Sequence, residues 1–391
     1  MKRNPMPQLI LLIILLFATG VNCYSQELKS IDQEKFNELI QSKLDSIYNS
    51  AIDFGGATIG IVLPDGRKSS FSVGFSDVEE KIKMKPSDRM LGGSTGKIFV
   101  SSSIMQLVEK GTLNLDDNVR KYFIDIDWFR RVQNSDQLTI RNLLQHSSGI
   151  SRYVFEEKFQ NDIKKDPDRI WHPEELLSYV LDKEPLFEPG SDFAYSDTNY
   201  IILGMIIEKV TGISMYDYID KNILSPSGIE HISPQTKRVL DGLVPGYNSV
   251  DDSFYPGKVV EDGVYKYNVQ FEWAGGGYVM NTADLAAAGK LIYEGNVFSK
   301  DLFSEFFSGI EAKGLGGEWG LGVHMRNTPD GLTYGHSGFF PGYVTNMIYY
   351  SDYKFAIAIQ VNTSARDNLG LFRKLNAFMP QVIDAIIVGS D

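Results

Sequence analysis

The sequence predicts an α+β fold in which an antiparallel sheet is flanked by N- and C-terminal helices and carries a large, mostly helical insertion. Three observations predict it. Segments rich in β-forming residues lie near both ends of the chain, helical periodicity occurs at residues 32–52 and 368–387, and the middle alternates helices with loops. With 391 residues, 43% of them hydrophobic, the chain can bury a sizeable core.

The first residues have the pattern of an export signal. Lys2 and Arg3 precede an apolar run at residues 9–17, and small or polar residues follow up to Ser25. The run is too short to span a bilayer comfortably. We expect residues 1–25 to be removed, leaving residues 26–391 as one domain in the periplasm or outside the cell. Lipid anchoring at Cys23 is the alternative, which the preceding Asn22 disfavours.

Two groups of strands are expected in the sheet. Residues 57–63 and 69–76 flank the turn sequence Pro64-Asp65-Gly66 and predict a hairpin. Near the other end, four segments separated by turn residues predict an antiparallel meander: residues 320–326, 332–336, 343–350 and 355–361. The helical insertion between the two groups is expected to run from about residue 80 to 285.

The segment Ser94-Thr95-Gly96-Lys97 opens an amphipathic helix that is expected to end at Lys110-Gly111. Residues three apart share a helix face, so the pattern places a hydroxyl beside an amine. The serine needs a base, and an amine can serve if burial or nearby positive charge makes it neutral. By itself the pattern is weak, because a solvated lysine beside an N-cap serine has the same sequence.

The same serine also fits a different fold. Residues 92–96 match the G-x-S-x-G pattern of the lipase nucleophile elbow. That elbow follows a strong parallel strand, whereas the polar residues 81–88 come before Ser94. Regular alternation of strands and helices is also missing elsewhere, so the lipase alternative is disfavoured.

Four further segments occur in a fixed order after Ser94: residues 143–150 with His146-Ser147-Ser148-Gly149, residues 193–197 with Tyr195-Ser196-Asp197, residues 275–285 with three glycines, and residues 335–338 with Gly335-His336-Ser337-Gly338. Together with Ser94 and Lys97, they resemble the class C β-lactamase and DD-peptidase group, which includes esterases and D-aminopeptidases. The resemblance covers about residues 52–361 and implies a β-lactamase/transpeptidase-like fold.

The resemblance also implies roles for individual residues. Ser94 matches the acylated nucleophile, Lys97 its helix partner, and Tyr195 the tyrosine that passes the proton to the leaving group. The triplet that begins at His336 and continues with Ser337 and Gly338 matches the K-T-G or H-x-G element on a strand at the pocket edge. The backbone N–H groups of Ser94 and Phe339 would form the oxyanion hole.

Two residues depart from the family pattern. Asp197 stands where most relatives have asparagine; it cannot donate an amide hydrogen bond, but it could hold Lys97 charged. His336 replaces a permanent cation, so we expect recognition of a substrate carboxylate to improve near pH 6, as the imidazole gains charge. Both departures favour short esters over β-lactams.

Composition limits the partners and cofactors. The net charge is −12 without any basic cluster, which argues against nucleic acid. The histidines lack metal-ligand spacing, so we expect no metal and no cofactor, and His146 is expected to be structural. The expected function is an exported serine hydrolase that forms an acyl-enzyme with a small ester, amide or D-amino-acid peptide. A β-lactamase, or a weakly catalytic protein that binds peptidoglycan fragments, is the alternative.

Overall fold

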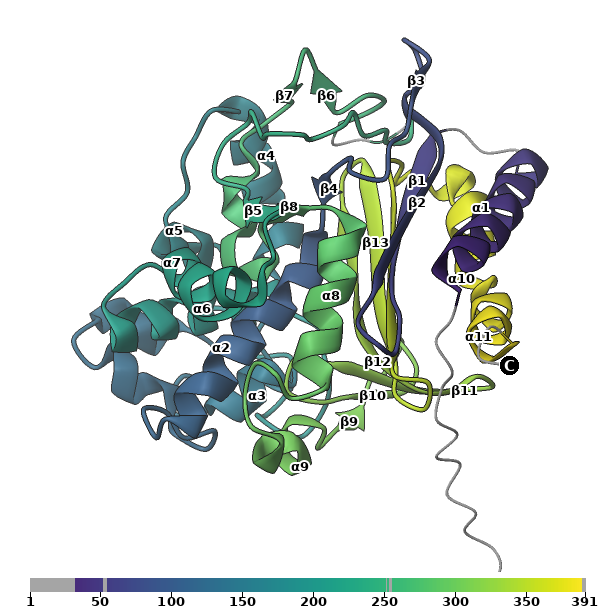
Figure 1. Ribbon diagram of the computed structural model, residues 1–391. Coiled ribbons are helices and arrows are strands. Elements are labelled where there is room, and N and C mark those ends of the chain that lie inside the picture. The colour runs from purple at the N-terminus through teal and green to yellow at the C-terminus, as the bar shows by residue number, and fades with distance from the viewer. Residues whose placement is uncertain (1–31, 52–54, 251, 253–254, 389–391) are drawn as a thin grey trace, which may run out of the picture.

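The computed structural model describes residues 32–51, 55–250, 252 and 255–388. The expected export signal, with Cys23, lies outside the described residues. The fold has three layers: helices from the two ends of the chain, a central sheet and a larger helical region (Figure 1). No helix in the described part of the chain is long and apolar enough to cross a membrane.

The central sheet has nine strands in the order β3-β2-β1-β14-β13-β12-β11-β10-β9, and all neighbours are antiparallel. The predicted hairpin is formed by β1 and β2, and β14 pairs with β1, which joins the two chain ends. The strand bounds are β1 (Gly56–Val62), β2 (Lys68–Asp77), β3 (Ile82–Lys83), β9 (Ile310–Glu311), β10 (Glu318–Trp319), β11 (His324–Thr328), β12 (Gly331–Phe340), β13 (Tyr343–Tyr350) and β14 (Phe355–Val361).

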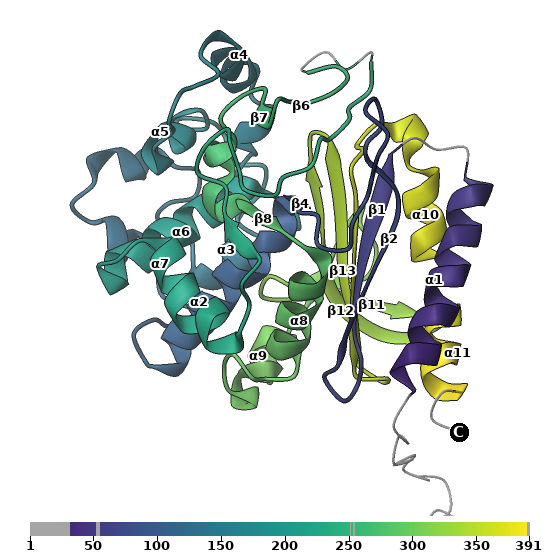
Figure 2. The same cartoon turned by 45° about the horizontal axis from the view of Figure 1, so that its top comes forward.

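Three terminal helices cover one face of this sheet (Figure 2). They are α1 (Gln33–Ser50), α10 (Gly370–Asn376) and α11 (Met379–Val388). The Asp32 side chain caps α1 by accepting a hydrogen bond from the N–H of Lys35. Apolar residues of α1, such as Ile40 and Leu44, pack with those of β1 and β14 in one buried cluster. The predicted C-terminal helix is thus present as two shorter helices.

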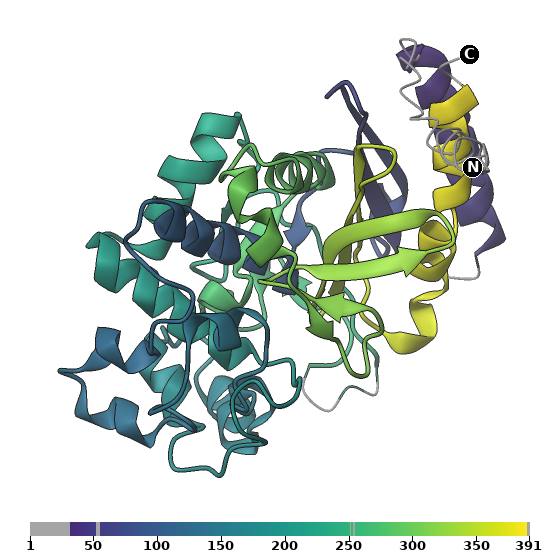
Figure 3. The same cartoon turned by 90° about the horizontal axis from the view of Figure 1, so that it is seen from below.

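The other face of the sheet is covered by α8 (Thr282–Tyr293), which contacts β1, β13 and β14. Gly60 permits this contact, because a Cβ there would lie 2.4 Å from the backbone of Thr282. Beyond α8 lies the helical region, seen from below in Figure 3. The predicted α+β class is confirmed, with both chain ends in the sheet.

The helical region supplies the elements that carry the predicted site. Its helices are α2 (Lys97–Glu109), α3 (Ile140–Leu144), α4 (Glu157–Lys165), α5 (Pro173–Ser178), α6 (Asp197–Thr211), α7 (Met215–Ile219) and α9 (Phe303–Phe306). A small sheet in the order β4-β8-β5 and a two-stranded β6-β7 ribbon complete it, with bounds β4 (Met90–Leu91), β5 (Ile232–Pro234), β6 (Val260–Glu261), β7 (Val264–Tyr265) and β8 (Tyr278–Met280).

Candidate active site

Ser94 lies in a short 3-10 turn, η1 (Gly93–Gly96), that leads directly into α2. Lys97 is the first residue of α2, and its Nζ lies 2.9 Å from Oγ of Ser94. Glycines make the turn possible: Gly93 has φ +52, and a Cβ on Gly276 would lie 2.8 Å from Cα of Ser94. The predicted juxtaposition of hydroxyl and amine is therefore present, although a 3-10 turn rather than the α-helix carries the serine.

The Lys97 side chain is fully buried, and its Nζ also donates to Oδ1 of Asp197 at 2.8 Å and to the carbonyl of Gly275 at 2.5 Å. Burial lowers the pKa of Lys97, but the charge of Asp197 outweighs it and holds the pKa above its ordinary value. Lys97 is therefore an ammonium, and the condition under which it could act as the base, a neutral amine, is not met. The ion pair with Asp197, which the sequence left as one possible role of this carboxylate, is present.

Arg152 is a site residue that the sequence did not indicate. Its Nε and Nη2 donate to Oδ2 of Asp197 at 2.9 and 2.6 Å. Burial raises the pKa of Asp197, but the two cations Lys97 and Arg152 hold it well below its usual range. A buried carboxylate thus bridges two positive charges. The only sequence signal for Arg152 was its place two residues after the end of the His146 to Ile150 motif.

The loop that carries Arg152 is tied to the start of α6. The carbonyl of Ser151 accepts a hydrogen bond from Oγ1 of Thr198 at 2.7 Å, and the N–H of Tyr153 donates to the same hydroxyl at 3.2 Å. Just before α6 begins, the N–H of Ser196 donates a hydrogen bond to Nδ1 of His146 at 3.1 Å. These bonds join two sequence motifs into one structural unit, and the predicted structural role of His146 agrees with them.

Tyr195 precedes α6 and places its ring between the lysine and an aromatic cluster. Nζ of Lys97 lies 5.1 Å from the ring centroid, and the ring of His146 packs 4.1 Å from it. Trp319 of β10 packs against Tyr195 and His336 at 5.4 and 5.1 Å. Burial raises the pKa of the Tyr195 phenol, and Lys97 and Ser94 are close enough to lower it in part. The phenol is therefore protonated at neutral pH.

His336 lies on β12 and is buried. Its Nδ1 lies 2.6 Å from the carbonyl of Ser337, so this nitrogen carries the proton and donates it. Burial and the positive charge of Lys97 lower the pKa of His336 to about 3. The expectation that His336 gains charge near pH 6 is therefore wrong, because a buried imidazole facing an ammonium stays neutral.

The backbone of β12 reaches the nucleophile at Gly338. A Cβ on this glycine would lie 1.9 Å from the carbonyl of Gly92 and 3.2 Å from the nitrogen of Ser94. A Cβ on Gly93 would likewise lie 2.8 Å from the nitrogen of Phe339. The two segments thus pack backbone against backbone, and each carries one of the N–H groups expected to form the oxyanion hole. The side chains of Ser337 and Phe339 are exposed and alternate with the buried His336 and Gly338.

Glu272 is a second residue that the sequence did not single out. It lies in the 3-10 segment η7 (Val269–Gly275), whose last carbonyl binds Lys97. Burial raises its pKa to about 8, although the charge of Lys97 opposes this rise. Glu272 is therefore mainly protonated at neutral pH. Its only sequence signal was a position shortly before the Gly275 to Gly277 run.

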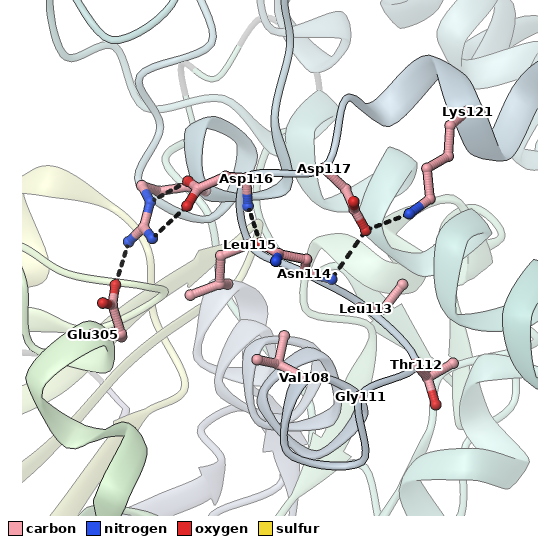
Figure 4. A pocket seen from close by; sticks show the side chains of 11 residues that line it. Val108, Gly111, Thr112, Leu113, Asn114, Leu115, Asp116, Asp117, Lys121 and Glu305 are labelled. Atoms are coloured by element: carbon pink, nitrogen blue, oxygen red, sulfur yellow. Dashed lines mark hydrogen bonds and ion pairs between the residues drawn. The ribbon is translucent and has the colours of Figure 1, made fainter.

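A separate surface hollow lies at the opposite end of α2 (Figure 4). Its charged side chains are paired with one another: Arg141 binds Asp116 and Glu305, and Lys121 binds Asp117. Within the described ranges, no group of three or more His, Cys, Asp or Glu side chains could hold a metal ion. The chemistry is concentrated around Ser94.

A serine that accepts a hydrogen bond from a buried lysine, beside a tyrosine and an antiparallel strand, is the arrangement of a serine hydrolase with the β-lactamase fold. The chain belongs to the Beta-lactamase family, whose model matches residues 44–377. It is similar to penicillin-binding protein 4* of Bacillus subtilis (strain 168), with 29% identity over 297 residues, 72% of this chain and 62% of that protein. The chain therefore spans less than two thirds of this relative.

A relative of comparable length is the teichoic acid D-alanine hydrolase of Staphylococcus aureus, 25% identical over 384 residues, 91% of this chain and 87% of the relative. Among solved structures, D-amino acid amidase from Ochrobactrum anthropi SV3 superposes with a TM-score of 0.75 at 22% identity, covering 91% of this chain and all of that one (100%). The octameric penicillin-binding protein homologue from Pyrococcus abyssi has a TM-score of 0.67 at 26% identity and covers 85% and 74% of the two chains.

Proposed function

We propose that the protein is an exported serine hydrolase that forms and hydrolyses an acyl-enzyme on a small ester, amide or D-amino-acid peptide. The observation that carries the proposal is the 2.9 Å contact between Nζ of Lys97 and Oγ of Ser94. The phenol of Tyr195 adjoins the same ammonium. Export rests on the signal-like pattern of residues 1–25 alone.

In the proposed acylation, Oγ of Ser94 attacks the substrate carbonyl carbon. Because Lys97 is already protonated, the serine proton passes to the Tyr195 oxygen while the phenol proton passes to the leaving group. The bond to the leaving group breaks, and the N–H groups of Ser94 and Phe339 bind the transient oxyanion. Lys97 stabilises the negative charge that develops on the serine oxygen.

In the proposed deacylation, a water oxygen attacks the ester carbonyl. The water proton passes through Tyr195 to Oγ of Ser94, which leaves as the restored alcohol. The products are the carboxylic acid and the free enzyme, so no group of the protein is consumed. The relay needs one phenol and one fixed cation, and the described side chains supply both.

The names of similar proteins support a small substrate with a D-amino-acid part, because they include a D-amino acid amidase and a teichoic acid D-alanine hydrolase. The second candidate, a β-lactamase, is disfavoured by Asp197. Both of its oxygens already accept hydrogen bonds from Lys97 and Arg152, and a carboxylate has no N–H to offer the amide of a β-lactam. The other alternative, a weakly catalytic protein that binds peptidoglycan fragments, is disfavoured because Ser94, Lys97 and Tyr195 are all present.

The test is covalent labelling with a fluorophosphonate, read by intact mass and peptide mapping, with Ser94→Ala as the control. We expect one label, on Ser94, and none in the variant. Label on Ser147, Ser196 or Ser337 with Ser94 free would contradict the proposal. Turnover of p-nitrophenyl acetate, D-alanine p-nitroanilide and a cephalosporin then ranks the substrates, and a cephalosporin hydrolysed fastest would restore the β-lactamase alternative.

A further inference from the structure

We propose that Arg152 is a specificity-determining residue whose guanidinium binds a carboxylate group of the substrate. This inference rests on the proposed function for the location of the substrate. The sequence assigned the recognition of a substrate carboxylate to His336 on β12. Under the present proposal, Arg152, in the helical region, recognises this carboxylate instead. His336 cannot do so, because it is buried and neutral.

Arg152 is the outermost member of a chain of charged contacts that starts at the nucleophile. Lys97 contacts Ser94, Asp197 contacts Lys97, and Arg152 contacts Asp197. The side chains of Lys97 and Asp197 are 0% and 8% exposed, whereas that of Arg152 is 32% exposed. It is therefore the cation of this chain that a dissolved substrate can reach.

The guanidinium of Arg152 has N–H groups that its bonds to Asp197 do not use. Nε and Nη2 bind Oδ2 of Asp197, while Nη1 has no acceptor among the described residues. A guanidinium has five N–H donors in a planar fork that suits carboxylate oxygens. Arg152 can thus keep its bond to Asp197 and still present N–H groups to a substrate anion.

The charges around Arg152 favour an anion. At pH 7, Lys97 and Arg152 contribute two positive charges and Asp197 one negative charge, while the neighbouring Glu272 is mainly protonated. The two site histidines are neutral, since burial lowers the pKa of both. The cluster therefore has a net charge of about +1, which attracts a carboxylate.

Two rings and two backbone bonds hold Arg152 in place before any substrate binds. Its Cζ lies 4.2 Å from the ring centroid of Phe155 and 5.2 Å from that of Tyr195. The residues on either side of it, Ser151 and Tyr153, are bonded to Thr198 of α6. Phe155 is 65% exposed, so it also offers an apolar surface beside the cation. A positioned arginine loses little conformational entropy on binding.

The test uses two pairs of esters that differ only in charge. The first pair is mono-p-nitrophenyl adipate and its methyl ester, with the carboxylate on the acyl part. The second is 4-acetoxybenzoate and its methyl ester, with the carboxylate on the leaving group. The measured quantity is the ratio of kcat/KM for the charged ester to that for its neutral partner, corrected for spontaneous hydrolysis, in native protein, Arg152→Met, Arg152→Lys and Arg131→Met.

We expect Arg152→Met to lower this ratio about tenfold or more for at least one pair, mainly through KM, because charge-assisted hydrogen bonds are the strong ones. Arg152→Lys should retain part of the preference, since it keeps the charge but loses the fork. Arg131→Met is the matched control: Arg131 pairs with Asp182 on the exposed surface of the same region, and the ratio should not change.

An unchanged ratio for both pairs in Arg152→Met, with both esters slowed equally, would overturn the proposal and leave Arg152 as a positioning residue for Asp197. Binding separates this outcome from failure of the proposed function. Calorimetry with monomethyl adipate on Ser94→Ala needs no turnover, and we expect its affinity to fall about tenfold in Ser94→Ala/Arg152→Met. Equal affinities in the two variants would overturn the inference even if Ser94 is labelled as expected.

Discussion

The carboxylate of Asp197 lies 2.8 Å from the ammonium of Lys97, and both side chains are buried. Because opposite charges at this distance stabilise each other strongly in a protein interior, the lysine is a fixed cation rather than a base. In the proposed acylation, the proton of Ser94 therefore moves through Tyr195.

Lys97→Ala and Tyr195→Phe should each reduce acylation by at least about a hundredfold, the lower range for positioned proton transfer. The reasons differ: the first removes the cation beside the serine oxygen, and the second removes the relay oxygen. The measurement is the rate of labelling by the fluorophosphonate at constant circular dichroism. Near-native labelling of Tyr195→Phe would rule out the phenol relay.

Asp197→Asn should destabilise the fold by about 3 kcal/mol, because it leaves two buried or half-buried cations without their shared anion. It should also raise acylation by a fluorescent penicillin, since an amide N–H becomes available. Urea unfolding and gel fluorescence measure the two effects. Asp182→Asn is the control, because its pair with Arg131 is exposed, and it should cost less than about 1 kcal/mol. Equal losses from both variants would contradict the prediction.

Stability should fall as the pH rises from about 7 to 8. Burial raises the pKa of Glu272 from its ordinary value of 4.5 to about 8. Between these two pH values, Glu272 holds a proton in the folded protein but has lost it in the unfolded chain. Unfolding therefore releases this proton, and the free energy of unfolding decreases with pH. The buried histidines act in the opposite direction, because their pKa values are lowered in the folded protein while the unfolded chain binds protons around pH 6.5. Their effect outweighs that of Glu272 below about pH 7, which sets the lower limit of the range.

Glu272→Gln should flatten this slope, as measured by urea unfolding at several pH values between about 7 and 8. The substitution keeps the shape of the side chain and removes its titration. A slope that is the same in the native protein and the variant would show that another group is responsible.

Gly338→Ala should abolish most of the activity. Its methyl group would lie 1.9 Å from the carbonyl of Gly92, so β12 must move away from Ser94 and the two expected oxyanion donors separate. Loss of one such donor costs about a hundredfold to a thousandfold in kcat. Gly275→Ala is the control, because its nearest contact is an ordinary 3.9 Å. Ester hydrolysis by the two variants is compared; equal rates would refute the steric argument.

Much of the fold was predictable because its signals are local. Alternating β-forming residues around Pro64-Asp65-Gly66 predicted the hairpin, and periodicity after Asp32 predicted α1, whose N-cap that residue forms. The C-terminal helix was predicted as one element. It is two, since α10 ends at Asn376 and α11 begins at Met379, and Pro380 in the first turn of α11 is the sequence signal that marks this boundary.

By itself the sequence determined the β-lactamase fold and placed Ser94 beside Lys97, because residues three apart across a helix start meet whatever surrounds them. The tertiary structure alone decided the charges. Arg152 and Asp197 are 45 positions apart, and Glu272 is further still, so no spacing rule could join them to Lys97. Protonation depends on burial and on charges brought close by folding, which made Lys97 a cation and kept His336 neutral.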